Sequence, residues 1–414
     1  MPRPQTPGGV ERSRLRSLAA AFTSLTAMIA TSLVAGPASA DSAAGPCALA
    51  RTGAHHSEGV DSWNAAYSRP QGRLDAVMVF LSFPDSAPDA TPDELAADYF
   101  PDTSGFFRRA SYGRFELRAH PVRTWVKMPR ASGAYGIERD WDPGLRTKYL
   151  SDAVKAADSR VDFSRYDIVY LIADPDAPGV DSDATKVVNF ARPLLADGSA
   201  LRRIVTVFEQ HPPDRNVLAH ETGHVFDLPD LYKRPQDGKG DWDTHVGDWD
   251  LMGSQFGLAP EPFGWHKWKL GWLDRHQVGC VRRGGTSLHS LTPLTAPAAA
   301  PGADDGERLL VVRTGEAAAL ALEVRENRGN DSGTCTRGVL VYRVRSGAAS
   351  GGGPMEVLDG HPRTSACRES SVYPPLADAP LGVGERMTDR ASGVAVEVLG
   401  TDSSGRWTVK VTRP

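Results

Sequence analysis

Apolar runs and helical apolar spacing alternate along the first two-thirds of the chain. Continuous apolar runs at 74–83 and 166–173 predict strands buried on both faces, and 203–209 predicts a further strand. Helical spacing predicts helices over 91–111 and 149–157, the first starting at Thr91-Pro92-Asp93-Glu94. Strands that alternate with helices indicate a layered α/β (α+β) fold around a mixed sheet.

The pattern changes near residue 275. Helical spacing stops, and short apolar segments separated by Gly-, Pro- and Ala-rich turns follow at 308–313, 318–325, 338–344, 393–399 and 406–411. Regularly spaced short strands are typical of an antiparallel β-sandwich. We therefore expect two folded regions, an α/β region over 71–274 and an all-β sandwich-like region over 275–414.

The first 70 residues differ in composition from both regions. An arginine-rich start, an apolar stretch and the small-residue site Ala38-Ser39-Ala40 make 1–40 typical of a secretory signal peptide. A retained membrane anchor is the less favoured alternative, because the apolar stretch is short and diluted by Ser and Thr. Residues 41–70 are polar and rich in Ala and Gly, so we expect a flexible leader or short pro-segment with His55-His56 exposed.

The charge of the chain excludes one class of partner. The chain holds 47 basic and 51 acidic residues, for a net charge of −4. Residues 1–40 contain four of the basic and one of the acidic residues, so the exported remainder has 43 against 50, near −7. Without a basic block we expect no nucleic-acid partner. We expect a secreted, extracellular monomer with no membrane span after signal removal.

Four cysteines remain after the expected signal peptide: Cys47, Cys280, Cys335 and Cys367. An even number in an exported chain favours two disulfides, for which three pairings are open. Proximity in sequence favours Cys335 with Cys367, which leaves Cys47 for Cys280. A Cys47 thiolate that caps a metal before activation is a less favoured hypothesis, since the even count argues for pairing.

The segment His220-Glu221-Thr222-Gly223-His224 carries the candidate chemistry. Histidines four residues apart on a helix lie one turn above each other, so both imidazoles can reach one zinc ion. Glu221 lies beside the pair, where it can act as a base on a metal-activated water. Asp214 is a fair N-cap for such a helix, and Pro229 would end it. The alternative is an amphipathic surface helix whose histidines meet by accident.

Asp230 is the favoured third ligand. It lies six residues after His224, where the metzincin pattern H-E-x-x-H-x-x-G-x-x-H places its last ligand, and zinc also accepts carboxylate oxygen. Asp227 occupies the position that holds glycine in that pattern. Asp tolerates a left-handed backbone better than most residues. His245 is a rival third ligand that ranks lower because it has no known offset.

Further segments resemble a known family. Asp248-Trp249-Asp250-Leu251-Met252-Gly253 looks like the Met-turn of metzincins, and Leu228 to Tyr232, Ser111-Tyr112-Gly113 and Pro262 to Trp272 add to it. With the zinc helix, these segments resemble the immune inhibitor A type of secreted metallopeptidase over roughly 74–345. The third-ligand aspartate is also similar to that of snapalysin-like enzymes.

The resemblance implies a metzincin-like zincin fold and a zinc metalloendopeptidase that cleaves proteins or peptides. It implies zinc ligands His220, His224 and Asp230, with Glu221 as general base. Met252 would pack beneath the site without ligating, and Tyr232 is a weak candidate for an oxyanion donor. Two alternatives stay open: a zinc hydrolase of non-peptide amides or esters, and a secreted binding module on a degenerate peptidase scaffold. The complete His-Glu-His set disfavours the binding module, which has no need for Glu221.

The loop before Met252 is a second candidate metal site. Its carboxylates Asp237, Asp241, Asp243, Asp248 and Asp250 suit a structural Ca²⁺, which takes oxygen ligands. A solvated loop is the favoured interpretation, because no EF-hand spacing is present. We expect His266 to be structural and the tryptophans of 262–272 to lie in the core.

Overall fold

The computed structural model describes residues 44–235, 239–298 and 306–414. The expected signal peptide at 1–40 therefore lies outside the described residues. Across the described ranges, no helix combines the length and the apolar character needed to cross a membrane.

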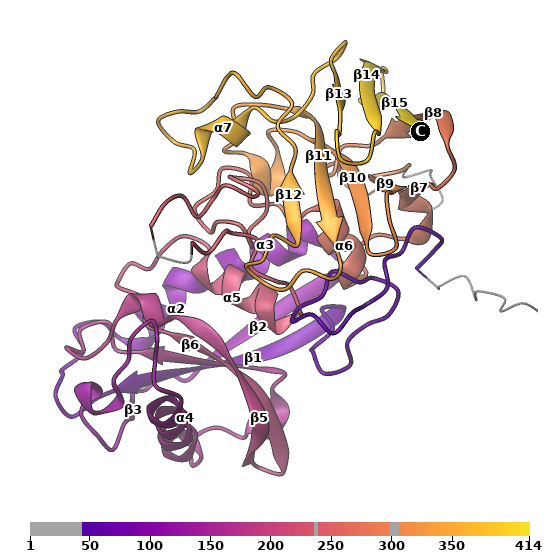
Figure 1. Ribbon diagram of the computed structural model, residues 1–414. Coiled ribbons are helices and arrows are strands. Elements are labelled where there is room, and N and C mark those ends of the chain that lie inside the picture. The colour runs from indigo at the N-terminus through magenta and orange to yellow at the C-terminus, as the bar shows by residue number, and fades with distance from the viewer. Residues whose placement is uncertain (1–43, 236–238, 299–305) are drawn as a thin grey trace, which may run out of the picture. The chain divides into compact units, whose positions relative to one another are not determined.

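A mixed sheet of six described strands forms the α/β part of the fold (Figure 1). Its order is β2-β1-β4-β6-β5, and β3 pairs with one end of β1. The strands are β1 (Gly72–Ser82), β2 (Phe115–Pro121), β3 (Val126–Lys127), β4 (Ile168–Ala173), β5 (Lys186–Ala196) and β6 (Ser199–Val207). Only the pairing of β5 with β6 is antiparallel. The mixed sheet is confirmed, and so are the two predicted buried strands and the further strand, which correspond to β1, β4 and β6.

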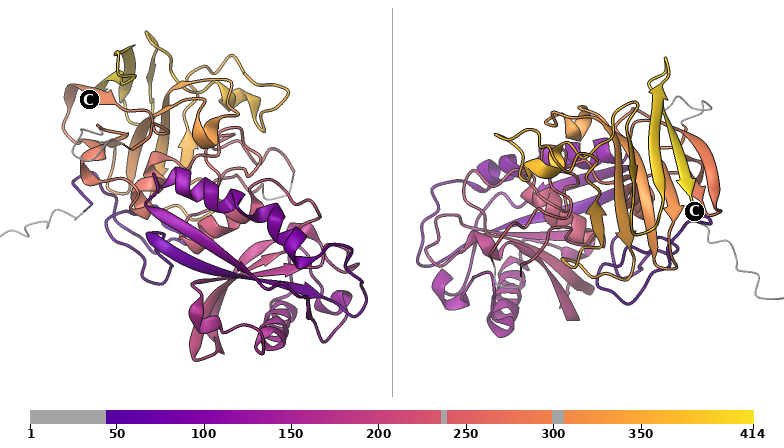
Figure 2. Two further views of the ribbon diagram at one scale, coloured as in Figure 1. Left: turned by 180° about the vertical axis from the view of Figure 1, so that it is seen from behind. Right: turned by 45° about the horizontal axis from the view of Figure 1, so that its top comes forward.

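Helices cover both faces of this sheet (Figure 2). They are α2 (Pro92–Tyr99), α3 (Asp102–Ala110), α4 (Pro143–Ala157) and α5 (Val217–Val225). Met78 of β1 shares a hydrophobic core with α2, α3 and α5, whereas its neighbour Val79 shares a separate core with α4. Because successive side chains of a strand point to opposite faces, the buried part of β1 from Ala76 to Leu81 needs an apolar residue at every position.

The predicted helix over 91–111 is two helices. α2 begins at the expected start, where Thr91 and Glu94 form a capping box, and the chain turns at Pro101 before α3. Proline lacks an N–H and its ring clashes with the preceding helical turn, so one continuous helix does not form. α4 begins six residues earlier than predicted, because the Asp142 side chain caps it and Pro143 suits its first position.

The strands after residue 275 form two further sheets, ordered β12-β11-β10-β9-β7 and β13-β14-β15-β8. Their bounds are β7 (Val278–Val281), β8 (Gly285–Leu291), β9 (Leu309–Arg313), β10 (Ala318–Arg325), β11 (Gly338–Arg345), β12 (Met355–Val357), β13 (Arg386–Thr388), β14 (Ala395–Thr401) and β15 (Trp407–Arg413). The two sheets share a core that includes Val312 and Val409. The second sheet is antiparallel throughout, but β7 runs parallel to β9, so the prediction of only antiparallel strands is wrong there.

The sheet β12-β11-β10-β9-β7 has one face in the core shared with the β13-β14-β15-β8 sheet. Its opposite face packs against the α/β part of the fold. Val311 of β9 and Tyr342 of β11 belong to the same core as the helix α6 (Gly264–Leu270). The ring of Tyr342 stacks on Phe263 with centroids 4.2 Å apart. Trp265, Trp268 and Trp272 are buried in this core, as expected. One hydrophobic core therefore joins the strands after residue 275 to the helices that cover the mixed sheet.

Short helical turns complete the described elements: η1 (Ser132–Tyr135), η2 (Phe163–Arg165), η3 (Ser182–Ala184), η4 (Arg275–Gln277), η5 (Gly329–Asp331) and α7 (Pro374–Ala377). Both favoured disulfides are present, Cys47 with Cys280 and Cys335 with Cys367. The hypothesis of a free Cys47 thiolate that caps a metal is therefore wrong. Two disulfides are consistent with an oxidising, extracellular location.

Candidate metal centre

The predicted metal helix is α5, and it is shorter than expected. It begins after Asn216, whose φ is 61°, and not at Asp214. It ends at Val225, before Pro229, because the chain becomes left-handed at Asp227. The hydroxyls of Thr222 and Tyr170 lie 2.8 Å apart and connect α5 to β4 of the mixed sheet.

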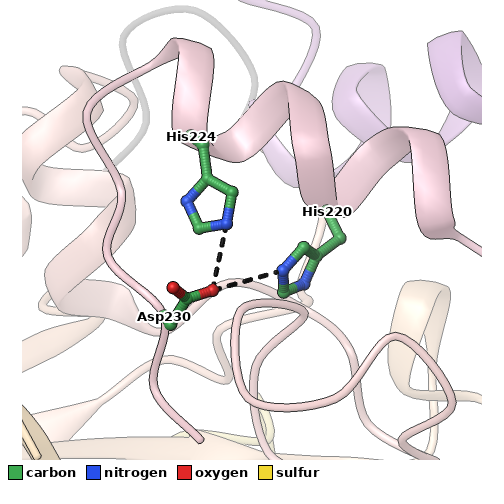
Figure 3. A group of neighbouring side chains, drawn as sticks. All are labelled: His220, His224 and Asp230. Atoms are coloured by element: carbon green, nitrogen blue, oxygen red, sulfur yellow. Dashed lines mark ion pairs between the residues drawn. The ribbon is translucent and has the colours of Figure 1, made fainter. Parts of the chain in front are cut away.

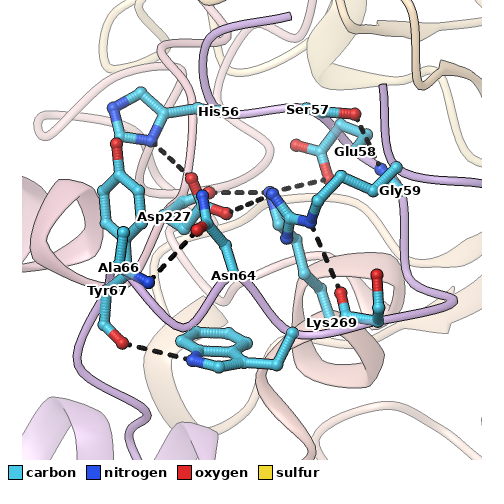
Figure 4. Close-up of polar contacts among 12 residues, drawn as sticks. His56, Ser57, Glu58, Gly59, Asn64, Ala66, Tyr67, Asp227 and Lys269 are labelled. Carbon is cyan, nitrogen blue, oxygen red and sulfur yellow. Dashed lines mark hydrogen bonds and ion pairs between the residues drawn. The ribbon is translucent and has the colours of Figure 1, made fainter. Parts of the chain in front are cut away.

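Asp227 forms the turn that follows α5. Its φ of 64° is the left-handed conformation expected at the glycine position of the metzincin pattern. Its buried carboxylate accepts from Arg51 at 2.8 Å and from His56 at 3.0 Å, and Lys269 donates to its carbonyl oxygen at 2.7 Å (Figure 4). Burial favours the neutral acid, yet His56, Lys269 and Arg51 hold the pKa of Asp227 below its ordinary range.

The turn brings Asp230 to the two histidines (Figure 3). Oδ1 of Asp230 lies 3.0 Å from Nε2 of His224 and 3.6 Å from Nε2 of His220. One ligand atom from each residue lies within 4.8 Å of the other two, so the group could hold a metal ion. Elsewhere in the described ranges, no group of three His, Cys, Asp or Glu residues has this spacing.

Backbone carbonyls orient both imidazoles. Nδ1 of His220 lies 2.9 Å from the oxygen of Leu251, and Nδ1 of His224 lies 2.8 Å from the oxygen of Leu228. A carbonyl only accepts, so Nδ1 donates in each ring, and in the neutral ring Nε2 keeps its lone pair. This is the tautomer and the support that metal-ligating histidines need.

The electrostatics of the group favour a bound cation. Burial alone would raise the pKa of Asp230, but His224 and His220 hold it well below its ordinary value. Burial alone would lower the pKa of His224, but the Asp230 carboxylate raises it to about 9. The buried carboxylate thus keeps its charge only beside a positive partner, and a metal ion can take the place of that proton.

Glu221 lies on the same helical turn as the histidines. Burial raises the pKa of its carboxyl, and the nearby histidines offset only part of that effect. Its Oε2 is buried and has no hydrogen-bond partner among the described residues. Leaving a buried oxygen unpaired is costly, so this atom is available to accept a hydrogen bond from a bound molecule. Glu221 and His220 line a cavity of about 380 Å³.

Met252 packs against α5 at Gly223, which precedes His224 in the sequence. A Cβ added to Gly223 would lie 2.4 Å from Sδ of Met252, so only glycine allows this approach. Asp250 shapes the turn, because its carboxylate accepts from the N–H groups of Met252 and Phe263, each at 2.7 Å. His266 is buried and donates to the same carboxylate at 2.7 Å, in agreement with its expected structural role.

The acidic loop before Met252 gives no support to a Ca²⁺ site. The carboxylate of Asp248 accepts from the N–H groups of Leu258 and Val372 and pairs with the Ser371 hydroxyl. Asp248 and Asp250 are buried, so the favoured solvated-loop interpretation is also wrong for these two. Both carboxylates bind backbone and side-chain donors instead. Asp237 lies outside the described residues, and Asp241 and Asp243 join no group with metal-ligand spacing in the ranges that are described.

His245, the rival third ligand, and Tyr232, the candidate oxyanion donor, differ in their position relative to the metal group. His245 faces Glu356, 3.8 Å away, and is not in the group with the paired histidines. Tyr232 lines the cavity that Glu221 lines, and its ring lies 5.4 Å from that of Trp242. Burial and Asp230 raise the pKa of Tyr232 above its ordinary value, so its hydroxyl stays protonated and can donate.

Two residues that contact the turn after α5 were not predicted from the sequence. Ser350, in the connection between β11 and β12, donates to Oδ2 of Asp230 at 2.9 Å. His56 is buried against Asp227, so the prediction of an exposed pair holds for His55 and is wrong for His56. Neither residue lies in a motif or near α5 in sequence, so no local pattern reveals it.

No protein-family model matches the chain, and no curated protein matches it. Among solved structures, the chain is similar to the crystal structure of wild type OgpA from Akkermansia muciniphila. The sequence identity is 9%, the match covers 72% of this chain and 93% of that chain, and the TM-score is 0.28. A likeness this distant carries no argument about the site.

Proposed function

We propose that this chain is a zinc-dependent endopeptidase of the metzincin-like, immune inhibitor A type. One observation carries the proposal: the ligand atoms of His220, His224 and Asp230 converge beside the unpaired buried oxygen of Glu221. The left-handed Asp227 and the contact between Met252 and Gly223 support the same family geometry.

The donor set suits zinc. Two imidazoles and one carboxylate are a usual set of three protein ligands for a catalytic zinc ion, with a further position open for water and substrate. The bonds from Nδ1 to Leu251 and Leu228 hold both rings with Nε2 toward Asp230. When bound, zinc would supply a Lewis acid that lowers the pKa of a water ligand toward about 7 and polarises the scissile carbonyl.

Glu221 would move the proton. Its Oε2 would accept a proton from the attacking water and return it to the leaving amine as the peptide bond breaks. The burial that raises the pKa of Glu221 brings the acid closer to neutral pH, where such a transfer is most efficient. The protonated Tyr232 hydroxyl would donate to the oxygen that gains charge, and Met252 would hold the floor of the site.

The test is the Glu221→Ala variant in casein digestion. We expect hydrolysis to fall by about 10³-fold, because general-base catalysis contributes roughly this factor, while zinc content stays at the wild-type level. Glu369→Ala, at an exposed glutamate, is the matched control and should digest casein normally.

If Glu221→Ala digested casein at the wild-type rate, Glu221 would not be the general base. A wild-type chain that turns over small amides or esters but not casein would replace the peptidase with the non-peptide hydrolase. A zinc-loaded wild-type chain with no hydrolytic activity would favour the binding module.

A further inference from the structure

The turn that carries Asp230 is held by two segments from outside the expected α/β region. Residues 51–57 precede that region, and residues 346–351 belong to the connection between β11 and β12. We call these two segments the clamp. The first holds Asp227 at the start of the turn, and the second holds Asp230 at its end.

The second segment binds Asp230 through three hydrogen bonds. The Ser350 hydroxyl donates to Oδ2 of Asp230 at 2.9 Å and accepts from the Asp230 N–H at 2.8 Å. The N–H of Gly351 donates to the Asp230 carbonyl at 3.0 Å. Backbone and carboxylate of the third ligand are therefore fixed together, and Oδ1 is the oxygen turned toward the histidines.

The first segment fixes the other end of the turn. Arg51 and His56 both donate to the carboxylate of Asp227, which is buried. The ring of His56 also lies 5.7 Å from that of His224, measured between centroids. This segment therefore contacts the turn at the residue that sets its left-handed direction.

The two segments also bind each other. The N–H of Ser350 donates to the oxygen of His55 at 3.3 Å. The hydroxyls of Thr52 and Ser57 each donate to the oxygen of Ser346 at 2.7 Å. The clamp is thus one hydrogen-bonded unit assembled from chain segments nearly 300 residues apart.

We propose that the clamp sets the position of Asp230 and, through it, the affinity of the site for zinc, with Ser350 as a positioning residue. The proposal rests on the metal centre of the proposed function. A carboxylate free to rotate would offer either oxygen and lose entropy on binding, whereas Ser350 leaves Oδ1 alone directed at the ion. Loss of such a supporting hydrogen bond typically weakens metal affinity by about 10- to 100-fold.

The chain offers a matched control for Ser350. Ser346 lies four residues earlier in the same segment, and its buried hydroxyl has no hydrogen-bond partner among the described residues. Ser350→Ala and Ser346→Ala therefore delete the same atom from the same connection. Only the first deletion removes a bond to Asp230.

The experiment measures zinc affinity by competition with a chromogenic chelator, using the complete secreted chain. We expect Ser350→Ala to bind zinc at least about tenfold more weakly than wild type, and Ser346→Ala to stay within about twofold. Both variants should still unfold cooperatively in the absence of zinc, which shows that they fold. Equal zinc affinity for Ser350→Ala and wild type would overturn the proposal, and so would equal weakening in both variants.

Cobalt substitution adds a readout that a merely structural role would not change. The visible absorption of bound Co²⁺ reports ligand geometry, so Ser350→Ala should shift the spectrum and Ser346→Ala should not. If Ser350→Ala fails to fold, Asp227→Asn tests the first segment, because Asn also tolerates a left-handed φ but weakens the contacts to Arg51 and His56. An unchanged cobalt spectrum in the folded variant, from either substitution, contradicts the clamp.

Failure of the clamp and failure of the proposed function are distinguishable. If wild type binds zinc but does not hydrolyse casein, the proposed peptidase activity is contradicted and the proposed role of the clamp is not. If wild type hydrolyses casein and Ser350→Ala binds zinc as tightly as wild type, the proposed role of the clamp is contradicted and the peptidase activity is not. A wild-type chain that binds no zinc removes both.

Discussion

His266 is buried between two carboxylates, with Oδ2 of Asp250 2.7 Å from its Nδ1 and Oε1 of Glu58 3.0 Å from its Nε2. Burial opposes the charged imidazole, yet Asp250 and Glu58 raise the pKa of His266 to about 9. Both ring nitrogens therefore donate at neutral pH. The charged ring links the Met-turn to residues 44–70, since Asp250 also accepts from the Met252 N–H.

This raised pKa predicts a pH-dependent stability. The contribution of His266 is fully present below the unfolded pKa of about 6.5 and is lost as pH rises through about 9. The stability difference between wild type and His266→Gln should therefore shrink by about 3 kcal/mol between pH 6 and pH 9.5. Urea unfolding at the two pH values measures it.

His276→Gln, at an exposed histidine, is the control and should track wild type at both pH values. A difference between wild type and His266→Gln that does not change with pH would show that the pKa of His266 is not raised in the folded chain.

At the scale of residues, the sequence predicts those site residues that lie at a fixed spacing from the two histidines. The left-handed Asp227 follows from its place in a spaced motif, and its φ of 64° agrees. Asp230 likewise comes to the histidines at the expected offset. His56 and Ser350 have no such offset, because their contacts to the turn exist only after distant segments pack together.

At the scale of elements, the contact between α5 and the Met-turn depends on one glycine. Gly223→Ala adds a Cβ that would lie 2.4 Å from Sδ of Met252. Alanine improves helix propensity by about 1 kcal/mol, but overpacking a core typically costs about 1–3 kcal/mol, so we expect a net loss of stability. Thermal unfolding measures the change in midpoint.

Gly105→Ala in α3 is the matched control. Its added Cβ would meet only the end of the flexible Arg109 side chain, at 3.1 Å. Because that guanidinium can move aside, the helix propensity gain should keep or raise the unfolding midpoint. Equal effects of the two substitutions would show that Met252 does not pack against Gly223.

Element prediction succeeds where apolar periodicity is strong and fails where local chemistry interrupts it. The strand β4 and the buried part of β1 from Ala76 to Leu81 are continuously apolar, and both strands are found where expected. The apolar pattern does not predict β5, because this edge strand is only partly buried and contains Asn189 and Pro193. Pro101 and Asp142 moved helix ends by capping or breaking, which periodicity does not detect.

At the scale of the whole molecule, the two expected regions share a core and several hydrogen bonds. Val311 and Tyr342 share a core with α6, Glu323 accepts from the Gly264 N–H at 2.7 Å, and Ser350 reaches Asp230. A chain that ends at residue 274 loses all these contacts and exposes the tryptophans of α6 to water. We predict that it does not fold on its own, because the lost apolar burial is the main stabilising term.

Circular dichroism during thermal unfolding, together with limited proteolysis, tests this prediction. The complete secreted chain should show a cooperative transition and resist cleavage, and the fragment should show neither. A cooperative, protease-resistant fragment would make 71–274 an independent domain. The sequence marks the change from helices to short strands near residue 275 but not this shared core, since both regions contribute ordinary apolar residues to it.

The central claim is that α5 and the turn after it hold zinc through His220, His224 and Asp230. The zinc content of two variants, Asp230→Ala and His245→Ala, measured per folded chain, tests it most directly. We predict that Asp230→Ala loses its zinc and that His245→Ala retains one ion, because only Asp230 lies with the two histidines. Full zinc in Asp230→Ala together with its loss in His245→Ala would contradict the account.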